Sequence, residues 1–148
     1  MSKKIAVAAD HAGFQMKVLV AEHLKKQGYE VIDLGPPNEE RVDYPDYGYK
    51  LAEAIRDGKA PRGIGICGSG IGIAIAMNRY KDVRAALAHD VTTARLARTH
   101  NDANVLALGA RLLGNDLALE CVNAFLSAEF EGGRHAGRVE KLGKCGVT

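Results

Sequence analysis

Five short, almost continuous apolar runs alternate with amphipathic stretches along this chain, and this alternation constrains the fold more than any other feature. The runs cover Ile5–Ala9, Glu30–Leu34, Gly63–Cys67, Val83–Ala88 and Asn104–Leu108. Apolar runs of this length are typical of strands that are covered on both faces. Because the strands alternate with helical segments through short connections, the chain predicts an α/β fold with a mainly parallel five-stranded sheet.

Helical periodicity separates these runs. In Phe14–Gln27 the apolar residues recur at three- and four-residue steps, and Gly28 follows where a helix end favours glycine. We expect further helices over Tyr47–Asp57, Gly70–Arg79, Val91–Arg98 and Asn115–Glu129. The stretch from Gly35 to Asp46 contains Pro36, Pro37 and Pro45 and predicts a long loop, which is either a lid or a plain connection.

Length and charge exclude several classes of protein. The chain has 148 residues and a formal net charge of +2, which suits a single domain over residues 1–148. That charge is too mild for a dedicated nucleic-acid binder. No apolar run approaches the roughly 18 residues of a membrane span, and the run after the basic start ends at Asp10, too early for a signal peptide. We therefore expect a cytoplasmic protein with neither a nucleic-acid nor a membrane partner.

Polar residues follow several of the expected strands. Asp10 and His11 follow the first strand, the segment from Cys67 to Gly72 follows the third, and Arg111 lies just beyond the fifth. Right-handed crossovers bring the carboxyl ends of parallel strands to one edge of a sheet, where ligands of such folds bind. We expect these residues to share a ligand site.

The most informative segment is Cys67-Gly68-Ser69-Gly70-Ile71-Gly72, whose glycines allow a tight turn with backbone N–H groups facing an anion. Known glycine-loop classes fit poorly. Ile73 stands where a dinucleotide fold has its third glycine and where a cysteine phosphatase has arginine, and no Gly-Lys-Ser/Thr completes a Walker A loop. A receiver domain would end this strand on aspartate rather than on Cys67. The loop thus predicts an anion site of another class.

Each candidate side chain has a chemical and a structural interpretation. Cys67 is either an activated thiol or a small core residue, and the Asp10–His11 pair either binds hydroxyls or caps a helix. His100 is either an acid–base group or a surface histidine. Arg134 and Arg138, four residues apart, suit a phosphate clamp or a solvated basic patch. The three cysteines show no CxxC pair, which argues against a zinc knuckle or a redox motif.

Taken in order along the chain, a set of motifs resembles the type B ribose-5-phosphate isomerases of the ribose/galactose sugar-phosphate isomerase family. The resemblance covers nearly the whole chain. It rests on Asp10-His11-Ala12-Gly13, Asp43-Tyr44-Pro45, Cys67-Gly68-Ser69-Gly70-Ile71-Gly72, His100-Asn101-Asp102-Ala103-Asn104-Val105, Gly109-Ala110-Arg111 and Glu131-Gly132-Gly133-Arg134-His135.

This resemblance implies a role for each matching residue. Cys67 corresponds to the base that moves a proton between C1 and C2 of the sugar, and His100 to the acid that helps open the furanose ring, with Asp10 binding the substrate or sharing that task. The hole for the enediolate oxygen corresponds to Gly68, Ser69, Gly70, Ile71 and Gly72 together with Asn101. The substrate and phosphate contacts correspond to His11, Arg111, Arg134 and Arg138.

The resemblance also implies an architecture and a reaction. It implies a Rossmann-like three-layer sandwich, an active site shared across a homodimer or a dimer of dimers, and no metal or organic cofactor. The implied reaction interconverts ribose 5-phosphate and ribulose 5-phosphate. One branch of the family carries its base as a downstream glutamate, whereas this chain has Ile73 there and keeps Cys67. A six-carbon substrate, allose or galactose 6-phosphate, and a non-catalytic sugar-phosphate sensor stay open as alternatives.

Overall fold

A computed structural model describes residues 3–146, and its centre is a sheet of five parallel strands. The strands are β1 (Lys4–Ala9), β2 (Glu30–Asp33), β3 (Arg62–Cys67), β4 (Ala85–Leu87) and β5 (Val105–Gly109). They lie in the order β2-β1-β3-β5-β4, and every neighbouring pair is parallel. The expected α/β class and parallel sheet are confirmed.

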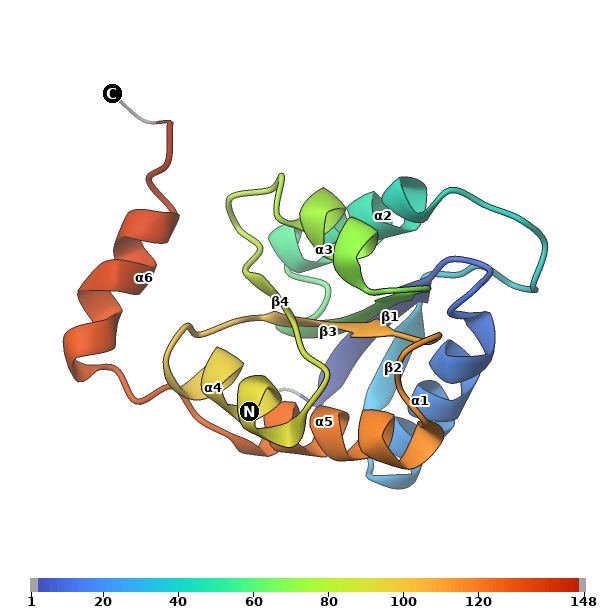
Figure 1. Ribbon diagram of the computed structural model, residues 1–148. Helices are drawn as coiled ribbons and strands as arrows, with labels where there is room; N and C mark the ends of the chain where they lie inside the picture. The colour runs from blue at the N-terminus through green and yellow to red at the C-terminus, as the bar shows by residue number, and fades with distance from the viewer. Residues whose placement is uncertain (1–2, 147–148) are drawn as a thin grey trace.

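Helices cover both faces of the sheet and make three layers (Figure 1). The helices on one face are α1 (Phe14–Lys26), α4 (Val91–Thr99) and α5 (Asn115–Ser127). The other face carries α2 (Tyr44–Arg56) and α3 (Ile71–Met77). Strand side chains alternate between the two cores: Val7 and Ile64 face the first, and Ala6 and Ala8 face the second. This two-sided burial explains why the strands are apolar throughout.

Several elements differ in length from their sequence-based expectations: α3 covers Ile71–Met77 rather than Gly70–Arg79, α5 ends at Ser127 rather than Glu129, and α2 and β4 differ for clear physical reasons. Helix α2 begins at Tyr44, three residues before the expected start, because Pro45 occupies the first turn, where its fixed φ fits a helix and its missing N–H costs nothing. Strand β4 covers only Ala85–Leu87 because it lies at the edge of the sheet, where its residues are half-buried. The long loop therefore ends at Asp43, the N-cap of α2.

The chain ends in a short 3₁₀ turn (Gly133–His135) and α6 (Ala136–Leu142). Figure 1 shows α6 projecting from the body, away from both layers that cover the sheet. None of the residues of α6 is buried, and Leu142 is 55% exposed. A helix with no buried face gains little stability from packing against its own domain. Over residues 3–146, no helix has the length and apolar character that crossing a membrane requires.

Candidate active site

The thiol of Cys67 lies at the carboxyl end of the central strand β3. The residue is 4% exposed and packs at the edge of the core under α2 and α3. Its Sγ accepts a hydrogen bond from the Gly70 N–H at 3.2 Å. A backbone donor therefore faces the sulfur at the end of this strand.

Gly70 gives the loop after Cys67 its shape. It has a φ of +77°, in the left-handed region, directly before α3 begins. A Cβ added there would lie 2.8 Å from the Leu108 carbonyl carbon and 3.0 Å from the Gly109 nitrogen, both backbone atoms of β5. Only glycine satisfies the φ and the close approach together. The loop is thereby pressed against β5 with its N–H pointing back to the sulfur.

Two further side chains lie over the glycines of this loop. A Cβ on Gly68 would be 3.2 Å from a terminal nitrogen of Arg111, and the Arg111 N–H donates to the Gly68 carbonyl at 3.0 Å. A Cβ on Gly72 would be 2.5 Å from the ring of Tyr44. The loop therefore has a guanidinium near its start and an aromatic ring near its end. Tyr44 belongs to the Asp43-Tyr44-Pro45 motif, but its contact with Gly72 was not foreseen from the sequence.

Asp10 and His11 occupy the neighbouring strand end, after β1. Asp10 is 6% exposed; its N–H donates to the Ile66 carbonyl, and its carboxylate accepts from the Gly13 N–H at 3.0 Å. This bond closes a turn before α1, but Asp10 does not cap that helix: its N-cap is Gly13, without a side-chain cap bond. The His11 Nδ1 lies 3.2 Å from the Val42 nitrogen and 3.1 Å from its carbonyl oxygen, so the ring is tied to the loop before α2. Cys67, Asp10, His11, Ser69 and Arg111 thus all lie at the carboxyl edge, as expected.

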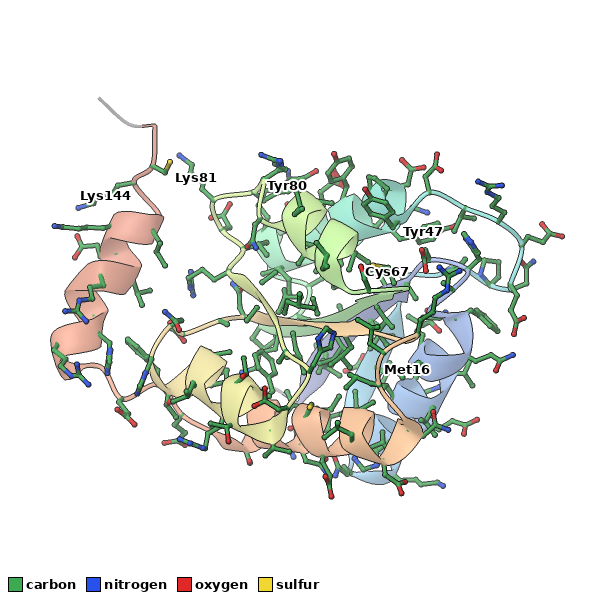
Figure 2. All side chains as sticks on the ribbon, in the orientation of Figure 1. Met16, Tyr47, Cys67, Tyr80, Lys81 and Lys144 are labelled. Carbon is green, nitrogen blue, oxygen red and sulfur yellow. The ribbon has the colours of Figure 1, made fainter. Side chains whose placement is uncertain are left out.

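The remaining candidates lie at the opposite edge of the sheet. His100 and Asn101 precede β5, and with Arg134, His135 and Arg138 they line a cavity of about 380 Å³. Arg134 and Arg138 come together there as the i,i+4 spacing predicted. Since the five residues of β5 span roughly 13 Å, these groups are separated from Cys67 by the length of the sheet. Figure 2 shows Cys67 and α6 on opposite sides of the molecule.

The other two cysteines differ from Cys67 in their surroundings. Cys121 is fully buried in α5, and burial raises the pKa of its thiol. Cys145 is exposed beyond α6. Neither adjoins the glycine loop, so among the cysteines Cys67 alone combines a strand end with a backbone donor to its sulfur.

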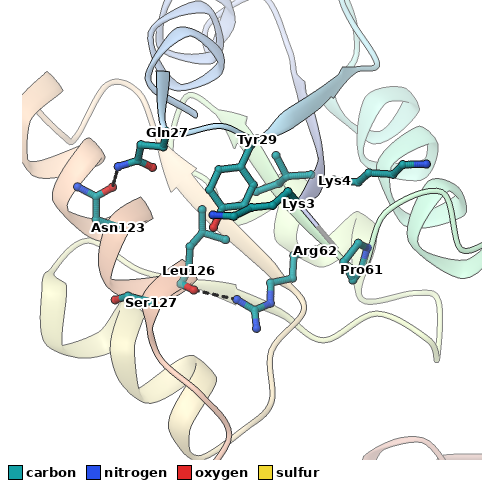
Figure 3. Close-up of a pocket in the computed structure, with 10 residues that line it drawn as sticks. Lys3, Lys4, Gln27, Tyr29, Pro61, Arg62, Asn123, Leu126 and Ser127 are labelled. Atoms are coloured by element: carbon teal, nitrogen blue, oxygen red, sulfur yellow. Dashed lines mark hydrogen bonds between the residues drawn. The ribbon is translucent and has the colours of Figure 1, made fainter. Parts of the chain in front are cut away.

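A cavity of about 560 Å³ opens at the amino edge near β1 and β3 (Figure 3). Lys3 lies over the ring of Tyr29 at 4.4 Å, and Arg62 donates to the Leu126 carbonyl at 3.0 Å. These cations already have partners, and the lining offers neither a thiol nor an imidazole. Volume alone therefore does not identify the reactive site.

One buried charge was not anticipated from the sequence. Lys17 of α1 is 2% exposed; its Nζ lies 2.8 Å from Asp33 and donates to the Pro36 carbonyl at 2.8 Å. It therefore pins the start of the loop that carries Val42 toward His11. A lysine on the inner face of an apolar helix shows no partner in sequence, because Asp33 lies on another element.

The fold and these strand-end groups define an α/β protein with a glycine-rich loop beside a buried thiol. Comparison with known proteins identifies the family to which this α/β protein belongs. The Ribose/Galactose Isomerase family matches residues 5–142. The chain belongs to this family, among its type B ribose-5-phosphate isomerases.

Individual relatives support this placement along almost the whole chain. Ribose-5-phosphate isomerase B of Escherichia coli is 47% identical over 140 residues, covering 95% of this chain and 94% of that protein. D-erythrulose-4-phosphate isomerase of Pectobacterium atrosepticum is also 47% identical over 140 residues, covering 94% of this chain and 92% of that protein.

Solved structures agree in fold. Ribose-5-phosphate isomerase B of Clostridium thermocellum is 54% identical, with a TM-score of 0.94 over 95% of both chains. The enzyme of Mycoplasma genitalium, solved with bound ribulose 5-phosphate, is 40% identical, with a TM-score of 0.91 over 95% of this chain and 94% of that one.

Proposed function

We propose that this enzyme interconverts D-ribose 5-phosphate and D-ribulose 5-phosphate through a cis-enediolate, a reaction of the pentose phosphate pathway. The observation that carries the proposal is the Cys67 sulfur, held at a strand end by the Gly70 N–H in a chain of this isomerase family. Relatives named for this reaction, and one solved with ribulose 5-phosphate bound, support the choice of substrate.

In the proposed mechanism Cys67 is the base. Its thiolate takes the C2 proton of the open-chain aldose, the C–H electrons form the C1–C2 double bond, and the carbonyl oxygen at C1 becomes an oxyanion. The same thiol then returns the proton to C1, while the proton of the C2 hydroxyl passes to the C1 oxyanion and C2 becomes the ketone carbon. C1 is reduced as C2 is oxidised, so the reaction balances within the substrate. A positioned base contributes about 10²–10⁴ in rate.

The glycine loop supports the oxyanion in this proposal. The first turn of a helix leaves N–H groups without intrahelical partners. Here the Ile71 N–H donates to the Ser69 hydroxyl at 3.2 Å, which shapes the loop. We assign the Gly72 N–H, in the same first turn, as a donor to the oxyanion. Each well-placed donor to such an oxygen contributes roughly 3–4 kcal/mol to the transition state. In this proposal Asn101, which lies beside His100, is a further donor to the oxyanion.

The second half of the proposed site opens the ring and binds the phosphate. His100 donates a proton to the furanose ring oxygen, with Asp10 holding the hydroxyls, and Arg134 and Arg138 bind the phosphate with His11 and Arg111. The phosphate does not react, but its binding energy positions the carbon chain for proton transfer.

We further propose that a second copy of the chain brings the two halves together. In one chain Cys67 and the His100 cavity lie at opposite edges of the sheet, so neither half is sufficient alone. The surface beside the glycine loop is apolar, with Ile71 and Ile75 of α3 each 51% exposed. Helix α6 buries none of its residues in its own domain. A homodimer that seats α6 against its partner's carboxyl edge would cover both surfaces and build two complete sites.

Two variants and two assays test the assigned roles. Ribulose 5-phosphate has no free C5 hydroxyl and stays open-chain, so exchange of its C1 hydrogen with heavy water needs the base but not the ring-opening acid. Cys67→Ala should lower both ribose 5-phosphate turnover and this exchange by at least about 10²-fold. His100→Asn should lower turnover and keep exchange within a few fold. Turnover by Cys67→Ala within tenfold of the unsubstituted enzyme would remove the sulfur from the mechanism.

Subunit mixing tests the shared site separately. When Cys67→Ala and His100→Asn proteins are unfolded together and refolded, half of the dimers are mixed, and each mixed dimer contains one intact shared site. Activity should recover to about one quarter of that of the unsubstituted enzyme. A site confined to one chain would give no recovery, because every mixed dimer would then have two defective sites.

Substrate length needs its own comparison, since relatives of equal identity are named for four- and five-carbon sugar phosphates. We expect the highest kcat/KM with ribose 5-phosphate in a panel that includes D-erythrose 4-phosphate, allose 6-phosphate and galactose 6-phosphate. A higher value for any of these three would reassign the substrate while leaving the proton-transfer chemistry in place.

A further inference from the structure

The imidazole of His100 lies against two groups to which the mechanism above assigns no task. The ring of His135 stacks on it, with centroids 4.3 Å apart and planes tilted by 15°. The Oε1 of Glu131 lies 3.9 Å from the His100 Nε2 and 3.7 Å from the His135 Nε2. Two imidazoles and one carboxylate thus meet at the mouth of the cavity formed with Arg134 and Arg138.

His135 and Glu131 are held by the backbone around them. Gly132 and Gly133 have φ values of +67° and +54°, and the chain turns there so that the His135 N–H donates to the Gly132 carbonyl. The Glu131 N–H donates to the carbonyl of Thr99, the residue before His100, at 3.0 Å. His135 is 7% exposed although it lies in a segment whose other residues are mostly in water. The turn therefore fixes the buried His135 ring in its stacked position against His100.

The His100 ring, by contrast, is not held by hydrogen bonds within the described residues. Across residues 3–146, no hydrogen bond of 3.5 Å or less reaches either ring nitrogen of His100, and its side chain is 37% exposed. The stacked ring and the nearby carboxylate are therefore the aromatic and charged contacts of this imidazole. A catalytic acid that rotates freely spends little time aimed at the oxygen it must protonate.

The same three residues are a poor cage for a metal ion, although their ligand atoms all lie within 4.8 Å of one another. An imidazole nitrogen offers its lone pair in the plane of its ring. The two rings are almost parallel, so their lone pairs point past any ion placed between them. The geometry suits support of one ring by the other.

We propose that His135 and Glu131 are positioning residues that hold the His100 imidazole in the orientation required for ring opening. This inference rests on the proposed function, because it needs His100 as the acid. His135 supplies a flat surface that fixes the ring plane, and Glu131 supplies a carboxylate oxygen 3.9 Å from the His100 Nε2 that limits rotation of the ring. Burial, and after it the neighbouring Arg134, lower the pKa of His135, which favours the neutral form of the supporting ring.

Three substitutions separate positioning from general stability. His135→Ala removes the supporting ring, His135→Phe keeps a flat ring without nitrogens, and Glu131→Gln keeps the shape without the charge. Glu129→Gln, an exposed carboxylate two residues away, is the matched control. Each protein is assayed for ribose 5-phosphate kcat and KM and for C1 hydrogen exchange of ribulose 5-phosphate, and its fold is checked by circular dichroism.

We expect His135→Ala and Glu131→Gln to lower kcat for ribose 5-phosphate by about 10- to 100-fold, with KM and exchange within threefold of the unsubstituted enzyme. His135→Phe should recover most of the loss caused by His135→Ala, and Glu129→Gln should change neither assay. Stacking also predicts a spectroscopic signature: the His100 ring protons should shift when the His135 ring is removed.

The outcomes distinguish this inference from the proposed function. Equal losses of turnover and exchange in a folded His135→Ala protein would show a structural role and overturn the inference, as would unchanged values in both assays. If His100→Asn itself retained turnover, the acid assignment would fail, whatever the His135 variants did. A His100 proton signal unmoved by His135→Ala would refute the stacking independently of any activity.

Discussion

A single methyl group at Gly70 provides the sharpest test of how this loop is built. In Gly70→Ala the new Cβ meets two constraints at once: the backbone has a φ of +77°, and neighbouring heavy atoms already occupy the space around the Cβ position. The left-handed φ alone costs roughly 1–2 kcal/mol for a residue with a Cβ. The Cβ would also lie 2.6 Å from the Leu87 Cδ1, 2.8 Å from the Leu108 carbonyl carbon and 3.0 Å from the Gly109 nitrogen.

These contacts differ in how easily they yield. The Leu87 methyl is the end of a flexible side chain, whereas the two β5 atoms belong to backbone that is paired with β3. Overpacking against such atoms adds about 1–3 kcal/mol. We therefore expect Gly70→Ala to lower the free energy of unfolding by about 2–5 kcal/mol in total, or else to push the loop away from β5 and weaken the Gly70 N–H bond to Cys67.

Gly28 offers the matched control. It has a φ of +90°, and a Cβ there would have no heavy atom within 4 Å. Gly28→Ala should therefore lose only the roughly 1–2 kcal/mol due to φ and keep full activity. Urea unfolding at one fixed protein concentration measures both variants, since the proposed dimer would make stability depend on concentration. If the two variants lost equal stability and both kept turnover, crowding of the Gly70 Cβ position against β5 would not contribute to the loss of stability, and this reasoning would be refuted.

Three further predictions follow from burial and charge. Phe125→Ala, at a fully buried position of α5, should lower the free energy of unfolding by about 3–5 kcal/mol in urea melts, and a loss below about 1 kcal/mol would contradict its place in the core. Cys145 is exposed whereas Cys67 and Cys121 are buried, so one thiol per native chain should react rapidly with Ellman's reagent; three fast thiols would show that the buried pair is open to solvent. Burial lowers the pKa of His135 below its ordinary 6.5, so the unfolded state binds the proton more readily, and stability should fall as pH drops below about 6.5. His135→Phe should flatten that slope in urea melts at about pH 7.5 and about pH 5, and an unchanged slope would mean that another group titrates.

The sheet could be predicted from the sequence because its strands are buried on both faces. Ile64 and Ile66 of β3 face one core while Gly63 and Gly65 lie against Leu51 and Met77 on the other side, so the strand contains no exposed polar position that would hide it. The edge strand β4 was less predictable, because its half-buried residues carry a weaker signal. The early start of α2 was missed because Pro45 was interpreted as part of a loop, although proline is well suited to a first helical turn.

Contacts between charged or aromatic residues that lie far apart in the chain could not be predicted from the sequence. Nothing in the local pattern links Lys17 to Asp33, or Tyr44 to Gly72, because each pair joins two separate elements. The stacking of His135 on His100 is of the same kind: both residues lay within recognised motifs, but no spacing rule connects positions on α4 and on the turn before α6.

The separation of the site into two edges could have been foreseen from strand direction. Cys67 and Asp10 follow their strands, so they lie at the carboxyl edge; His100 precedes β5, so it lies at the amino edge of the same parallel sheet. Residues before and after parallel strands are kept apart by the strand length itself. A mechanism that needs both Cys67 and His100 on one small sugar therefore demands a second chain, whatever the details of side-chain placement. The unburied helix α6 and the exposed Ile71 and Ile75 are the surfaces that such a second chain would cover. If analytical ultracentrifugation found an active monomer at assay concentration, the joint assignment of Cys67 and His100 to one reaction would be wrong.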